Sequence, residues 1–151
     1  MNWNHNLVLK NRLLLSKFLE KFSLNQLNTV PKGYRNSIFL NVAHIVVTQQ
    51  LLVYGLSNRP LLVDSELVKT YKKDTKTVHE ATEEELALVK TLLFSTIEQT
   101  KTDYDNGVFK NYTPYTTSLN VTLSTVDEAI RFNAFHEGIH LGYILAMKNT
   151  L

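Results

Sequence analysis

Apolar residues recur every three to four positions in four long segments of the chain, which is the spacing of the buried face of an α-helix. The segments cover residues 2–22, 34–56, 82–106 and 125–149. In the first segment the recurring apolar residues are Trp3, Leu7, Leu14, Phe18 and Phe22. Four amphipathic helices in 151 residues predict an all-α fold, a four-helix bundle, in a single domain spanning residues 1–151.

Capping residues mark where these helices begin and end. Thr82 with Glu85, and Thr125 with Glu128, have the spacing of a capping box, in which each residue of the pair binds the other's backbone N–H. The Asn106-Gly107 pair ends the third helix, because both residues tolerate the backbone conformation of a helix C-terminus.

The two connections that follow the second and third helices differ in character. Residues 61–81, between the second and third helices, are numerous enough to span the length of a bundle, so the helix order stays open. A short helix is expected there over residues 65–71. Residues 108–123 are rich in Tyr, Thr and Val, which favours an extended loop with a short strand.

Composition narrows the classes of function. The absence of cysteine excludes disulfides, Cys-ligated metals and a cysteine nucleophile, and fits a reducing compartment. The net charge of +2 does not favour nucleic acid as a partner, and the one basic group is interpreted as a solvated helix end. That group is Lys69, Lys72, Lys73 and Lys76.

The most apolar stretch, residues 37–47, is shorter than the about 20 residues of a membrane span. With no signal peptide recognised, we expect a cytoplasmic protein without a membrane partner.

Three histidines carry the candidate chemistry. His136 and His140 are four residues apart in the last helix, so both rings project from one face. His44 lies on an apolar face of the second helix. Three inward imidazoles predict a site for one divalent metal ion, because zinc accepts three such ligands and nickel, iron, cobalt and copper also bind imidazole. The alternative is that each is a core histidine bonded to a carbonyl or carboxylate. His5 and His79 are interpreted as surface residues.

The run from His136 to His140 also matches H-E-x-x-H, the motif of zinc peptidases. Those enzymes take a third ligand downstream, whereas the eleven residues after His140 contain no His, Asp or Glu. Glu137 is therefore either a general base or partner at the metal, or an ordinary exposed glutamate. Gly138 and Gly142 indicate either close packing of a neighbouring helix, which is the favoured interpretation, or room for a ligand.

The placement of these histidines resembles the DinB/YfiT-like superfamily. The resemblance rests on His44 within Asn41-Val42-Ala43-His44 and on the last-helix run from His136 to Gly142. It implies zinc or nickel on His44, His136 and His140, with open positions for water or substrate. Members are often homodimers, and related branches include transferases that use low-molecular-weight thiols.

Three functions follow as hypotheses. The first is a metal-dependent S-transferase, in which the metal activates a small thiol that attacks a small electrophile. The second is a metal-dependent hydrolase with Glu137 as the base. The third is a non-enzymatic metal-binding or interaction module, closed by a fourth ligand. Candidate substrate-pocket residues are Asn133, Tyr143 and Tyr115, with Glu137 as the candidate catalytic residue.

Overall fold

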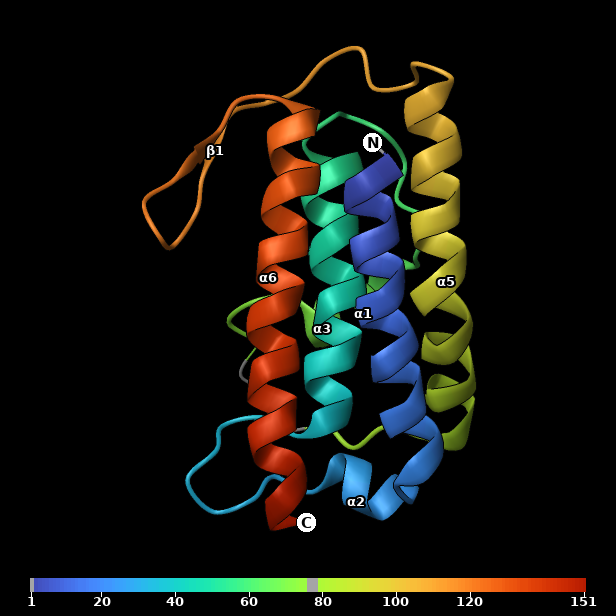
Figure 1. Ribbon diagram of the computed structural model, residues 1–151, viewed down its shortest axis with the longest axis vertical. Helices are drawn as coiled ribbons and strands as arrows, with labels where there is room; N and C mark the ends of the chain where they lie inside the picture. Colours follow the sequence, from blue (N-terminus) through green and yellow to red (C-terminus); the bar gives the residue numbers. More distant parts are fainter. Residues whose placement is uncertain (1, 76–78) are drawn as a thin grey trace.

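Four long helices stand side by side as a bundle in the computed structural model of the protein, which describes residues 2–75 and 79–151 (Figure 1). The bundle helices are α1 (Asn2–Lys21), α3 (Ile38–Gln50), α5 (Glu83–Asp105) and α6 (Val126–Met147). A π-helical turn, η1 (Leu51–Gly55), continues α3, and a 3₁₀ turn, η2 (Lys148–Thr150), continues α6. The shorter elements are α2 (Leu24–Asn28), α4 (Ser65–Tyr71), β1 (Tyr115–Thr116) and β2 (Thr122–Leu123). The all-α prediction is confirmed.

The bundle helices contact one another in the ring α1–α5–α3–α6. α1 and α6 run in one direction, and α3 and α5 run in the other (Figure 1). Because α3 and α5 are parallel, the segment between them must return along the length of the bundle, and it carries α4 on the way. The two short strands pair antiparallel in a hairpin that projects from the end of the bundle where α6 begins.

Side-chain caps determine where the helices start. Thr82 and Glu85 form the predicted capping box. Thr125 caps α6 through the N–H of Glu128, but the Glu128 carboxylate accepts from the N–H of Ser124, so the second predicted box is half formed. Ser37 caps α3 at Ile38, four residues after the predicted start. α2 was not predicted, although its Ser23–Gln26 capping box is visible in the sequence.

The continuous helix from Ile38 to Gly55 is the apolar centre of the bundle. Its 18 residues are long and apolar enough to cross a membrane by length and composition alone, because the apolar character continues beyond the predicted stretch of residues 37–47. Of that window, 72% is buried inside the protein, as in the core helix of a globular domain.

α1 buries only the second half of the predicted stripe. Phe18 is buried, and Leu14 and Phe22 pack against the core, as predicted. Trp3 and Leu7 are exposed, whereas Val8, Arg12 and Leu15 face the core. The buried arginine explains the error, because a charged residue breaks the apolar periodicity on the face that is in fact buried. Of the basic group, Lys76 lies outside the described residues.

Candidate metal centre

The bundle brings the three predicted histidines together. His44 comes from the middle of α3, and His136 and His140 come from successive turns of α6, which contacts α3. One ring nitrogen from each histidine lies within 4.8 Å of the others. The remaining histidines lie elsewhere: His79 pairs with Glu85 at an exposed position, and His5 is half-buried rather than on the surface as expected.

Hydrogen bonds orient two of the three rings. Nδ1 of His44 lies 2.8 Å from the carbonyl of Tyr71, and Nδ1 of His140 lies 2.8 Å from Oδ1 of Asn41. Both acceptors are oxygens, so each Nδ1 carries the proton and each Nε2 keeps its lone pair. The Asn41 amide is itself fixed, because its Nδ2 donates to the carbonyl of Ser37 over 2.7 Å. The core-histidine alternative accounts for these outer nitrogens and also for Nε2 of His44, which lies 3.2 Å from the Thr48 hydroxyl. It accounts less well for His136, whose ring has no partner outside the cluster among the described residues.

His136 is the least satisfied of the three rings. Its Nε2 lies 3.0 Å from Nε2 of His140, and its Nδ1 is buried without a hydrogen-bond partner among the described residues. An unpartnered buried nitrogen is costly for a protein to retain. Without a metal, the two facing Nε2 atoms can share a single hydrogen. A divalent ion could instead accept a lone pair from one nitrogen of each of the three rings, so the donor set fits such an ion.

The electrostatics of the cluster favour neutral imidazoles. Burial, and then the neighbouring His140 and His44, lower the pKa of His136 to about 3. Burial and His44 lower the pKa of His140 to about 4, and burial also lowers the pKa of His44. The three rings are therefore uncharged at neutral pH, which is the form that binds metal.

Two cavities adjoin the cluster. The larger, about 360 Å³, is lined by His44 and His136 together with residues of η1, the hairpin and α6. The smaller, about 220 Å³, is lined by His44 and His140 together with α4 and the segment that follows it. A ligand can therefore reach His44 through either cavity.

A family model described as the DinB superfamily matches residues 9–144, which include all three histidines. The chain belongs to the DinB superfamily. Comparison with curated proteins gave no match, and neither did comparison with solved structures. The match confirms the family predicted from the sequence. All three histidines of the cluster lie within the matched residues.

The role assigned to Glu137 is corrected by its contacts in this DinB bundle. Its side chain is fully buried rather than exposed, and its Oε1 lies 2.7 Å from Nη2 of Arg12. Asn11 and Asn133 also donate to the carboxylate. A residue one position after His136 is rotated by about 100° around the helix, so Glu137 faces α1 while the histidines face α3. It is therefore engaged in an ion pair and is not placed to act as a base at the cluster.

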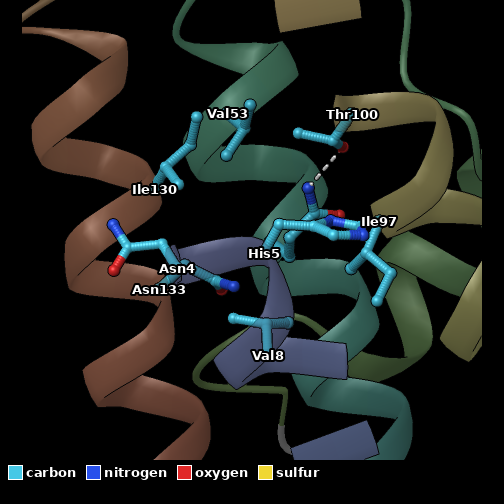
Figure 2. A pocket seen from close by; sticks show the side chains of 9 residues that line it. Asn4, His5, Val8, Val53, Ile97, Thr100, Ile130 and Asn133 are labelled. Atoms are coloured by element: carbon cyan, nitrogen blue, oxygen red, sulfur yellow. Dashed lines mark hydrogen bonds between the residues drawn. The ribbon is translucent and has the colours of Figure 1, made fainter. Parts of the chain in front are cut away.

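Asn133 was predicted in the substrate pocket and lies elsewhere. It is buried beside Glu137 and lines a separate cavity of about 30 Å³ (Figure 2). His5 lines the same cavity, near the hydrogen bond from Gln49 to Thr100. The i, i+4 spacing that links Asn133 to Glu137 places it with the ion pair, away from the two cavities beside the histidines.

The two predicted tyrosines have different positions. Tyr115 of β1 lines the larger cavity with His44 and His136. The hydroxyl of Tyr143 accepts from the N–H of Arg35, and its ring packs edge-on against Tyr34 at 5.2 Å. Tyr143 lines neither cavity, so only Tyr115 is placed as a pocket residue.

The two glycines of α6 do not bring a helix close. A Cβ atom built at Gly138 or Gly142 meets nothing within 4 Å. The expectation of close helix packing at these positions was wrong, because both face away from the bundle. Sequence reasoning also missed Asn41, Arg12 and the Tyr71 carbonyl, whose roles depend on partners distant in sequence.

Proposed function

We propose that this DinB protein binds one divalent metal ion through His44, His136 and His140 and is a metal-dependent S-transferase. The observation that carries the proposal is the cluster of three neutral imidazoles, two of which, His44 and His136, line a cavity large enough for a small molecule. Zinc or nickel is the expected ion, because both accept imidazole nitrogen.

The protein residues would hold and orient the reactants. When bound, the metal would lower the pKa of a low-molecular-weight thiol, which must come from outside because the chain has no cysteine. The sulfur would form a bond to an electrophilic carbon, the leaving group would depart with its electron pair, and the thiol proton would pass to solvent. Tyr71 and Asn41 would keep the lone pairs of His44 and His140 directed inward.

Hydrolysis is the less favoured chemistry. A hydrolase of this kind needs a base near the attacking water. Among the described residues that line the larger cavity, none is Asp or Glu, and Glu137 is held by Arg12. A thiol has a lower pKa than water and depends less on a protein base.

A closed, non-catalytic site is favoured even less. Such a site would need a fourth protein ligand. In the part of the chain that the structure describes, the cluster consists of three histidines with no Asp or Glu among them. We place the activity in the cytoplasm, where small thiols stay reduced.

Elemental analysis of purified protein is the first test. We expect about one equivalent of zinc or nickel in the wild type, retained in His5→Ala and lost in His140→Ala. His5→Ala is the matched control, since it removes a histidine outside the cluster. Wild-type protein that takes up no metal even after reconstitution would refute the proposal.

A substrate screen then separates the chemistries. Turnover of 1-chloro-2,4-dinitrobenzene with a series of small thiols, in the metal-loaded protein, is expected to exceed the metal-free rate. Hydrolysis of p-nitrophenyl acetate without thiol would instead favour the hydrolase. Stoichiometric metal with neither activity would favour the binding module.

A further inference from the structure

Lys73 lines both cavities beside the histidines. His44 is the one other residue common to the two linings, within the described residues. Lys73 follows α4, where it was interpreted from the sequence as part of a solvated basic group. Its position at both cavity walls gives that lysine a place at the candidate site.

The larger cavity is mostly apolar, and its polar lining consists of a few hydroxyl groups, the imidazoles of His44 and His136, and one cation. Leu51, Leu52, Leu56 and Phe132 supply most of its apolar wall. Lys73 is the one Lys, Arg, Asp or Glu among its described lining residues. A site that is mostly apolar, with one placed charge, selects ligands that carry the opposite charge on an apolar body.

The Lys73 ammonium has little competition within the described part of the chain. Its recorded ion pair is with Oδ2 of Asp74, at 3.9 Å, and the two side chains are 61% and 84% exposed. An exposed pair at that distance contributes little free energy, so an arriving anion can displace it.

We propose that the larger cavity binds an apolar small molecule carrying one anionic group, with Lys73 binding the anion. As a statement about the substrate, this rests on the proposed function: the electrophile of the S-transferase would be an apolar anion. Lys73 then determines specificity for the anion, since it lines the cavity together with His44.

Lys72 provides the matched control. It lines the smaller, more polar cavity but not the larger one. Removing either lysine changes the net charge equally, so any difference between the two variants reports cavity contact rather than the general field of the protein.

The test uses two fluorescent probes that differ by one sulfonate: 8-anilinonaphthalene-1-sulfonate and neutral N-phenyl-1-naphthylamine. Each is titrated into metal-loaded wild type, Lys73→Met, Lys73→Arg and Lys72→Met. We expect Lys73→Met to weaken binding of the sulfonate about three- to tenfold and to leave the neutral probe unchanged. Lys73→Arg and Lys72→Met should resemble the wild type, and added salt should weaken the sulfonate alone.

The inference is overturned if Lys73→Met leaves sulfonate binding unchanged, weakens both probes equally, or matches Lys72→Met. Far-UV circular dichroism of each variant excludes misfolding as the cause. The metal content of each sample separates this result from the proposed function. A protein that lacks metal refutes the metal site, while the cavity and Lys73 can still be tested with both probes.

Discussion

At the scale of single residues, the histidines were predictable and their supporting partners were not. The i, i+4 spacing places His136 and His140 on one face whatever the rest of the fold. The same helical geometry turns Glu137 toward a different neighbour, and its partner Arg12 lies 125 residues away in the chain. Helical geometry therefore predicts the angle between these side chains from their spacing in the sequence. It does not predict which helix each side chain will contact.

Asn41 offers a test of the supporting hydrogen bonds. Asn41→Ala removes the acceptor of the His140 Nδ1 proton, so the ring loses both its tautomer preference and its orientation. We expect zinc affinity to fall by about 10- to 100-fold, measured by competition with a fluorescent chelator. Asn41→Asp keeps an acceptor oxygen and should retain most of the affinity. Equal affinities for Asn41→Ala and the wild type would contradict this role.

At the scale of elements, helix existence was easier to predict than helix detail. The predicted helix over 65–71 coincides with α4, because Asp64 caps it and its apolar residues are regularly spaced. The predicted helix over 34–56 became α3 followed by the wider turn η1, whose residues Leu51, Leu52 and Gly55 line the larger cavity. No residue type in that turn distinguishes a π-helical turn from an α-helical one, so this part of the site could not be foreseen.

Gly138 and Gly142 allow a test of the exposed face of α6. Glycine in a helix interior costs about 1 kcal/mol relative to alanine, and the structure leaves open space for a methyl group at both positions. Each Gly→Ala change should therefore raise the free energy of unfolding by about 0.5–1 kcal/mol, measured by urea denaturation.

The same variants bear on the predicted homodimer. Phe135 and Ile139 are exposed beside the two glycines, which favours this face as the place where a second copy would pack. If it does, added methyl groups should weaken association in light scattering, and a dimer stabilised by close helix contact should lose stability. A gain in stability with unchanged association would place the contact elsewhere.

At the scale of the whole molecule, the number of helices and the long return connection were predictable, and their ring order was not. An apolar stripe specifies that a helix is buried but not against which partner. The order α1–α5–α3–α6 instead matches specific polar contacts, such as Arg12 with Glu137 between α1 and α6 and Gln49 with Thr100 between α3 and α5. Such pairs have no local signature.

The histidine cluster should make the stability of the metal-free protein depend on pH. The pKa of His136 is lowered to about 3 and that of His140 to about 4, from 6.5. Between those values and 6.5 the unfolded chain binds more protons, so stability is full above pH 6.5 and is lost as pH falls toward 4. Each histidine can contribute a slope of up to about 1.4 kcal/mol per pH unit.

Urea denaturation with a chelator present, at several pH values from 7.5 to 5, measures this slope. That range lies above the titration of carboxyl groups whose pKa is lowered, such as those of Glu84 and Glu85. A His136→Gln/His140→Gln variant should have a shallower slope. An identical slope in the variant would show that other groups control the pH response.

The ion pair between the first and last long helices also sets an order of events during synthesis. Ribosomes add about 5–20 residues per second, so Arg12 is made on the order of ten seconds before Glu137. Throughout that interval the Arg12 guanidinium lacks the Glu137 carboxylate with which it pairs in the core, and His44 lacks the imidazoles of His136 and His140. A chain that stops before α6 therefore lacks both its internal charge balance and its metal ligands. Completion of the final helix is the step that commits the nascent polypeptide to its native state and to metal loading, and prematurely terminated copies should be substrates for cellular proteolysis.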